Sequence, residues 1–321
     1  MIVLQAGVPK SGNLWLYQIL ERSLEEAGLE RRRFITGHPI YPLARTWRLS
    51  YPEQAAVDVL DFEGGRVFCR ISNRFREAVD LDVYRARASH VWTHSEVHEA
   101  DIPSFARFDR IVCIVRDPRD VALSMAHFAF TPYMIEHYPH SSPTPEAYLE
   151  RHLVKIAKRW AQHVGGYLRA RDRLPLNLVC YERLLADFAT EYDRLLAFLG
   201  LELDAPTRQR VAASVSFAAM RASRPNHLRA GRSEGWRAAL SPAQIAAVAA
   251  VAGPMLDLLG YPRAAGASAL GLPEVPMQVE VAALAEATAV ARYSAAERWR
   301  NRAGRARTRL RVAWSRRGRR A

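Results

Sequence analysis

The segment that decides the fold is residues 2–20, IVLQAGVPKSGNLWLYQIL. It opens with an uninterrupted apolar run over 2–6, which favours a parallel strand buried on both faces. Gly and Pro then interrupt this run, and a helical pattern follows from Asn13. The sequence therefore predicts a buried strand, a tight loop over 7–12 and a helix.

The predicted loop carries groups that bind anions. Lys10 and Ser11 lie in it, and the backbone N–H groups of Gly12, Asn13 and Leu14 open the helix. Free amides, the positive end of the helix dipole and a Lys ammonium converge at such a helix start. We therefore expect an anion site, most naturally for a phosphate, and an ordinary strand–turn–helix without a ligand is the alternative.

The loop differs from the one that binds nucleoside triphosphates. That loop has the form G-x-x-x-x-G-K-[ST], in which Lys follows the second Gly. Here Lys10 precedes Gly12. The spacing thus argues against an ordinary triphosphate loop.

Length and composition narrow down the class of protein. A chain of 321 residues holds one sizeable domain plus an extension. We find no basic and apolar leader and no uncharged apolar run of about 18 residues, so neither a signal peptide nor a membrane span is predicted. Cys69, Cys113 and Cys180 lie in apolar, strand-like surroundings, which predicts reduced core thiols in a cytoplasmic protein.

The order of predicted elements defines the fold class. Strands are predicted over 2–6, 89–93, 110–115 and 176–181, a further strand over 66–71, a loop over 130–145, and helices over 13–27, 81–88, 119–129, 146–172, 189–199, 205–214 and 242–259. This order predicts an α/β, P-loop-like three-layer fold with a mostly parallel central sheet flanked by helices. The loops after Ala6, Thr93, Val115 and Tyr181 should then line one site.

Two further motifs follow predicted strands. Arg116 and Ser124 lie eight residues apart, and a guanidinium fork with a hydroxyl suits a phosphate monoester. A helix cap with a surface arginine is the plainer interpretation of this pair. His94 ends another strand and suits a base that takes a proton near neutral pH, and a strand-end histidine without a catalytic role is the alternative.

A shared metal is not predicted for the histidines of this region. Along a strand, His90 and His94 would lie about 13 Å apart, which is too far for one ion.

Together these motifs resemble the sulfotransferase family that uses 3′-phosphoadenosine 5′-phosphosulfate (PAPS), over residues 2 to about 260. The matching segments, in chain order, are PKSG (9–12) with Trp15, TH (93–94), IVRDPRDVALSMAHF (114–128), CYE (180–182) with FLG (198–200), SFAAM (216–220) and HLRAGRSEGWR (227–237). Their order along the chain is that of the family.

The resemblance implies a role for each motif. It implies a 5′-phosphosulfate site at Lys10, Ser11, Gly12, Asn13, Leu14 and Trp15, a 3′-phosphate site at Arg116, Ser124, Arg229, Ala230 and Gly231, and an adenine site at Trp15, Tyr181, Phe217 and Met220. It also implies that His94 is the general base and that Lys10 is catalytic. The reaction would move a sulfuryl group to a hydroxyl or, as a second choice, an amine, with PAP as product and no metal.

This sequence departs from the family pattern at several positions. Trp92 and Ala230 stand where the family has Lys, and Gly235 stands where it has Asp. Asn13 and Leu14 replace two threonines. Arg232 is the candidate to supply the cation that Ala230 removes.

The acceptor and the reaction leave alternatives open. A glycan, a lipid-linked glycan or a small metabolite would each supply the hydroxyl. An inactive PAP(S)-binding or membrane-associated scaffold is the main alternative to an enzyme. A nucleotide kinase or NTPase ranks lower, because a carboxylate for Mg²⁺ is expected where Arg116 follows the strand.

The chain beyond the motifs divides into a linker and a tail. The predicted sulfotransferase domain covers 1–263, the linker 264–280 and the tail 281–321, with one amphipathic helix over 281–314. Residues 291–321 hold 12 Arg and one acid, so most of the net charge of +13 lies there. The tail fits a solvated extension, a subunit contact or a peripheral contact with the inner face of a membrane, and no nucleic acid is expected.

Overall fold

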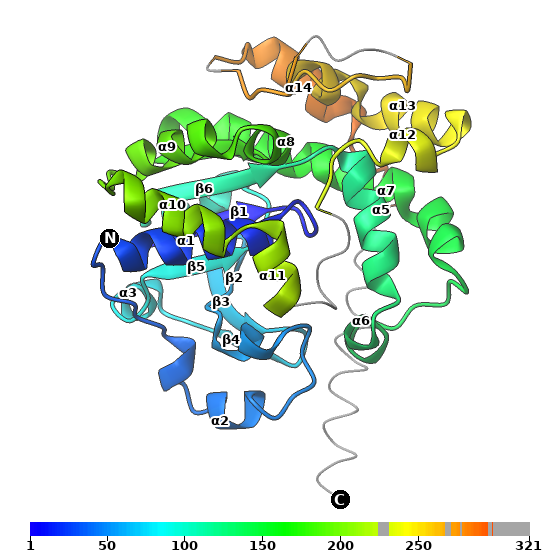
Figure 1. Ribbon diagram of the computed structural model, residues 1–321. Coiled ribbons are helices and arrows are strands. Elements are labelled where there is room, and N and C mark those ends of the chain that lie inside the picture. Colours follow the sequence, from blue (N-terminus) through cyan, green and yellow to red (C-terminus); the bar gives the residue numbers. More distant parts are fainter. Residues whose placement is uncertain (224–230, 267–270, 277, 295–296, 298–321) are drawn as a thin grey trace, which may run out of the picture.

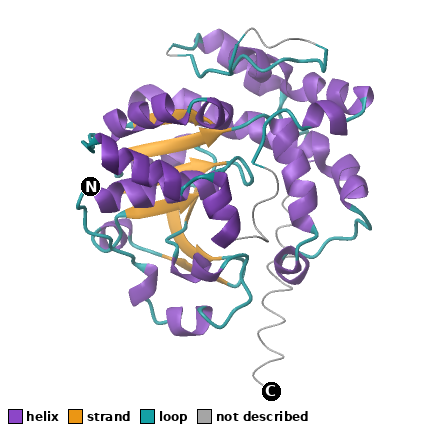
Figure 2. Cartoon of the chain, in the orientation of Figure 1, coloured by secondary structure: helices purple, strands orange, loops and turns teal. Residues whose placement is uncertain are grey.

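The computed structural model describes residues 1–223, 231–266, 271–276, 278–294 and 297. Its centre is a four-stranded sheet in the order β5-β1-β6-β7, and all neighbouring pairs are parallel. The strands are β1 (Val3–Gly7), β5 (His90–Thr93), β6 (Arg110–Val115) and β7 (Leu176–Cys180). The four strands predicted for this sheet are therefore confirmed, and Figure 2 shows them as one layer.

Helices cover both faces of this sheet and complete three layers (Figure 1). One face packs against α1 (Asn13–Glu26), α8 (Tyr181–Ala186), α9 (Phe188–Leu199) and α10 (Ala205–Ser214). On the other side lie α5 (Pro118–Ala129), α7 (Pro145–Ala170) and α13 (Pro242–Leu258). Alternation along β1 explains the layers, because Val3 packs with α1 whereas Leu4 and Ala6 pack with Tyr167 of α7.

Shorter helices lie in the chain segments between these longer elements. They are α2 (Tyr41–Ala44), α3 (Leu81–Arg85), α4 (Ile102–Phe105), α11 (Phe217–Ser223) and α12 (Trp236–Ala239). The three cysteines are buried free thiols, as predicted. No helix in the described part of the chain is long and apolar enough to cross a membrane.

A second, antiparallel sheet lies beside β5. It consists of β2 (Leu60–Glu63), β3 (Arg66–Ile71) and β4 (Phe75–Ala78). A turn at Gly64 and Gly65, both with positive φ, joins its first two strands. The strand predicted over 66–71 is confirmed, but the sequence analysis missed its two partner strands.

The loop predicted over 130–145 is wrong in part. It contains α6 (Pro132–His137). The hydroxyl of Thr131 accepts a hydrogen bond from the Met134 N–H, and Pro132 occupies the first turn. An N-cap residue followed by Pro at the first helical position is a common helix start.

The single helix predicted over 281–314 is also wrong. Helix α14 (Val281–Val290) ends early, and the chain turns at Ala291. Leu284, Ala287 and Ala291 are buried with side chains of α7 and α13. Beyond Ala291 the chain lies on α7, where the Tyr293 hydroxyl donates to the Lys155 carbonyl. Most of the predicted tail (298–321) lies outside the described residues.

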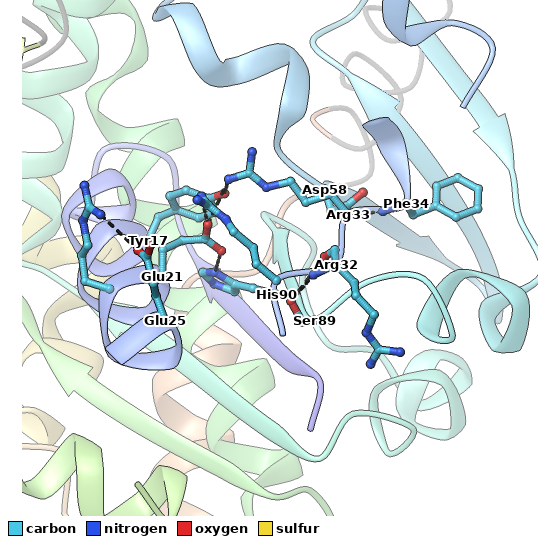
Figure 3. Close-up of polar contacts among 11 residues, drawn as sticks. Tyr17, Glu21, Glu25, Arg32, Arg33, Phe34, Asp58, Ser89 and His90 are labelled. Atoms are coloured by element: carbon cyan, nitrogen blue, oxygen red, sulfur yellow. Dashed lines mark hydrogen bonds and ion pairs between the residues drawn. The ribbon is translucent and has the colours of Figure 1, made fainter. Parts of the chain in front are cut away.

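A buried polar network joins α1 to β5 (Figure 3). Glu21 accepts a hydrogen bond from His90 Nδ1 at 2.9 Å and one from Arg33 Nη2 at 3.0 Å, and it also pairs with Arg31. Tyr17 stacks on the His90 ring at 4.8 Å between centroids. Burial opposes the charged form of Glu21, but the bond from His90 and the arginine charges outweigh it and lower the pKa to about 2. The carboxylate therefore stabilises the folded state.

We predict that Glu21→Gln removes part of the acid sensitivity of the fold. A carboxyl with a pKa of about 2 when folded and 4.5 when unfolded stabilises the protein fully above pH 4.5. It loses that contribution, about 3 kcal/mol at most, as the pH falls towards 2. Urea unfolding between pH 6 and pH 3 measures the change.

The matched control is Glu25→Gln, which removes an exposed acid of the same helix that pairs with Arg22. This variant should keep the wild-type slope of stability against pH. Equal slopes in Glu21→Gln and Glu25→Gln would contradict the prediction.

Candidate active site

The loop between β1 and α1 is held by two buried side-chain amides. Gln5 Nε2 donates to the Asn13 carbonyl at 2.6 Å, and Asn13 Nδ2 donates to the Val8 carbonyl at 2.7 Å. Gly12, with φ of 98°, precedes the first turn of α1. These bonds close the loop and aim the free N–H groups of the helix start at the cavity described below. The Asn13 side chain thus serves the loop backbone.

Lys10 extends from the tip of this loop. Its backbone has φ of 75°, a left-handed conformation that non-glycine residues seldom adopt. Its ammonium nitrogen lies 4.0 Å from the centroid of the Phe128 ring on α5, a favourable cation–π distance. Ser11 is fully buried behind the loop and does not line the cavity.

His94 is fixed against the same loop. Its Nδ1 lies 2.6 Å from the Gly7 carbonyl, which accepts the hydrogen bond. A proton on Nδ1 leaves Nε2 as the acceptor in the neutral ring. Burial, together with the positive charge of Arg70, lowers the pKa of His94 to about 3. The ring is therefore neutral near pH 7, and Nε2 carries the lone pair.

Two arginines surround His94 with positive charge. Arg70 of β3 bonds to Asp61 at 2.8 Å, and Arg159 extends from α7. Both guanidiniums line the same cavity as His94 and lower its pKa. Positive charge next to a base also favours an acceptor oxygen that is losing its proton. This end of the cavity thus suits deprotonation of a hydroxyl.

Arg116 joins the anion loop to the chain around residue 232. Its Nη1 donates to the Lys10 carbonyl at 3.2 Å, and its Nη2 donates to the Arg232 carbonyl at 2.9 Å. Its guanidinium also lies 4.3 Å from the Tyr181 ring centroid. Arg116 and Ser124 both line the cavity. The structure therefore brings together the arginine and the hydroxyl predicted to share a phosphate.

A buried arginine supports this arrangement from behind. Arg119 makes two hydrogen bonds to Asp117, at 2.9 and 2.6 Å, and its guanidinium lies 3.4 Å from the Trp236 ring centroid. Asp120 accepts a bond from the Trp236 N–H at 3.0 Å. The charged residues of segment 116–120 (RDPRD) thus anchor the part of the chain that leads from Gly231 to Trp236.

Aromatic rings form one wall of the cavity. Trp15 packs edge-on against Tyr181 and stacks against Phe188, with centroid distances of 5.6 and 6.0 Å. Gly231 lies on the Phe217 ring, where an added Cβ would come within 2.3 Å of a ring carbon. Flat rings on one side of a cavity suit a planar base.

One cavity of about 1800 Å³ collects these groups. A typical small-molecule pocket has roughly 300–1,000 Å³, so there is room for a nucleotide and a second molecule. Of the residues predicted for the site, the cavity is lined by Lys10, Gly12, Asn13, Leu14, Trp15, His94, Arg116, Ser124, Tyr181, Phe217, Met220 and Gly231. Arg229 and Ala230 lie outside the described residues.

Sequence reasoning missed several residues of this site. Arg70 comes from the second sheet, and no motif marks it. Arg159 lies on α7, where Tyr148, His152, Lys155 and Arg159 recur at helical spacing and all line the cavity. That spacing was available as a signal, because four polar or aromatic residues share one face. Phe188 carries no comparable signal.

Comparison with known proteins identifies the family. The chain matches the sulfotransferase domain over residues 2–260, so it belongs to the sulfotransferase domain family. It is 27% identical to Sulfotransferase 2B1 of Rattus norvegicus over 122 residues, which is 37% of this chain and 35% of that protein. It is 29% identical to Cytosolic sulfotransferase 1 of Danio rerio over 132 residues, 40% of this chain and 43% of that protein. The chain thus spans less than half the length of these curated relatives.

Solved structures share the fold at low sequence identity. Mouse sulfotransferase SULT7A1 complexed with PAP is 20% identical, with a TM-score of 0.52, over 77% of this chain and 81% of that one. Retinol dehydratase in a complex with retinol and PAP is 18% identical, with a TM-score of 0.50, over 77% and 79% of the two chains. The sulfotransferase fold expected from the sequence is therefore confirmed.

We predict that Gly231→Ala weakens binding of PAP, the nucleotide that the sequence motifs imply. The new methyl group would displace the Phe217 ring from the cavity wall, so we expect a loss of affinity of about tenfold, or about 1.4 kcal/mol. Isothermal titration calorimetry with PAP measures it.

Gly200→Ala is the matched control, because Gly200 also has positive φ but an added Cβ there meets nothing within 4 Å. It should lower stability without changing PAP affinity. A loss of PAP affinity as large in Gly200→Ala would show that backbone strain, and not the Phe217 contact, is responsible.

Proposed function

We propose that this protein is a PAPS-dependent sulfotransferase that modifies a hydroxyl-bearing acceptor. The observation that carries the proposal is the 2.6 Å bond between His94 Nδ1 and the Gly7 carbonyl. It holds a neutral base at the edge of the anion loop, within one cavity that also contains Arg116 and Ser124. Membership of the sulfotransferase domain family supports the same reaction.

The proposed step is transfer of the sulfuryl group to the acceptor oxygen. The bond between sulfur and the bridging oxygen of the phosphosulfate breaks, and its electron pair stays on the 5′-phosphate of PAP. A new bond forms between sulfur and the acceptor oxygen, whose proton passes to His94 Nε2. Lys10 and the N–H groups at the start of α1 stabilise the charge that develops on the leaving phosphate.

The 3′-phosphate and the adenine, which lie far from the reacting sulfur, orient the nucleotide. Arg116 and Ser124 hold the 3′-phosphate, and Arg229 is expected to join them. Trp15, Tyr181, Phe217 and Met220 hold the adenine. Binding energy from these groups positions the sulfuryl group against the acceptor, which lowers the entropic cost of the reaction.

The first experiment tests the nucleotide. PAP should raise the melting temperature more than ADP or GTP at equal concentration, because only PAP presents a phosphate to Arg116 and Ser124 from its 3′ position. Thermal shift measures this preference. An equal or larger shift with ADP or GTP would contradict PAPS as the donor and favour the kinase or NTPase interpretation.

A second experiment separates catalysis from binding. We expect His94→Ala and Lys10→Ala to lower the rate of PAP release from PAPS by about 10²-fold or more, whereas PAP affinity changes less than about tenfold. Phenols, sugars and lipid alcohols serve as acceptor probes.

His98→Ala is the control, since His98 lines the same cavity but is exposed and lies near Glu96. It should keep its activity. If wild-type protein binds PAP but releases none from PAPS with any acceptor, the chain is the inactive scaffold instead.

A further inference from the structure

The C-terminal segment, defined here as residues 291–294 and 297, reaches the cavity although the family match ends at residue 260. Helix α14 positions it. Gln162 Nε2 of α7 donates to the Thr288 carbonyl at 2.7 Å, and Leu284 and Ala287 are buried against the core. The segment therefore leaves α14 from a fixed point on the surface of α7.

After α14 the chain runs back along α7. Tyr293 donates its hydroxyl to the Lys155 carbonyl at 3.5 Å. Lys158 pairs with both carboxylate oxygens of Glu297, at 2.9 and 3.1 Å. Ser294 and Glu297 exchange two hydrogen bonds, at 2.6 and 3.1 Å. These contacts hold the C-terminal segment on α7 from both sides of Tyr293.

Tyr293 lies beside the face of α7 that lines the cavity. It lines the same cavity as His152, Lys155 and Arg159, which extend from one face of α7. Arg159 is near enough to His94 to lower its pKa. The anion loop, Arg116 and the adenine wall come from other elements, so Tyr293 belongs with the acceptor end.

We infer that Tyr293 contacts the acceptor and helps to determine which acceptor is used, with the Lys158–Glu297 pair positioning it. The half-buried Tyr293 ring lines the cavity, while its hydroxyl donates to the Lys155 carbonyl. Such a surface suits a hydroxyl-bearing acceptor with a flat apolar or aromatic body. This inference rests on the proposed function, because it assumes that the His94 end receives the acceptor.

The test uses full-length protein loaded with PAP and 1-naphthol as the acceptor probe. Calorimetry gives the affinity for PAP and then for 1-naphthol. We expect Tyr293→Ala to weaken 1-naphthol binding about fivefold or more and to leave PAP affinity within about twofold of wild type. Tyr293→Phe keeps the ring and should bind 1-naphthol nearly as well as wild type. Lys158→Met should weaken 1-naphthol binding by a smaller factor.

Val281→Ala is the control for α14, because Val281 is exposed and remote from these contacts. It should match wild type in both titrations. Unchanged 1-naphthol affinity in Tyr293→Ala overturns the inference, as does failure of PAP-loaded wild type to bind 1-naphthol. Failure of wild type to bind PAP is a different result, which overturns the proposed function itself.

Discussion

The carbonyl and the missing side chain of Gly7 constrain the whole site. The carbonyl accepts the hydrogen bond from His94 Nδ1. A Cβ on Gly7 would lie 2.6 Å from Asn13 Oδ1 and 2.9 Å from the Ile114 carbonyl. Only glycine therefore lets the chain leave β1 this close to β6 and enter the anion loop. One backbone position thus sets the distance between the candidate base and the loop that we propose to receive the leaving phosphate.

Around this point the structure places charge in two different ways. Arg119 is fully buried, and Asp117 and the Trp236 ring compensate its charge. It therefore supports the backbone and does not line the cavity. Arg70 and Arg159 instead line the cavity beside His94. An uncompensated buried charge costs several kcal/mol, which explains why the supporting arginine is paired with Asp117. Arg70 is also paired, with Asp61 at 2.8 Å, but it lines the cavity together with Arg159.

The sequence predicted much of the fold because its signals are local. Each strand of the central sheet is a short apolar run, and the motifs around Lys10, Arg116 and Tyr181 each lie where such a strand ends. Parallel strands then bring their carboxyl ends to one edge. The strand that carries Arg70 was predicted, but its place beside His94 was not, because β2 and β4, the short strands that pair with β3, were missed. The sequence did not predict that α14 ends at Val290 either, because contacts with α7 override the helical spacing of the tail.

The sequence by itself determined the layers of the fold and the family, and it supplied the residues that we propose to hold the nucleotide. Apolar periodicity and residues adjacent in the chain encode all of these. Only the tertiary structure decided what surrounds His94 at the proposed acceptor end, where side chains come from β3, α7 and the segment after α14. These elements are separated by tens of residues or more, and packing alone brings them together. The physical reason is that contacts between distant segments depend on burial and pairing in three dimensions, which no local pattern records.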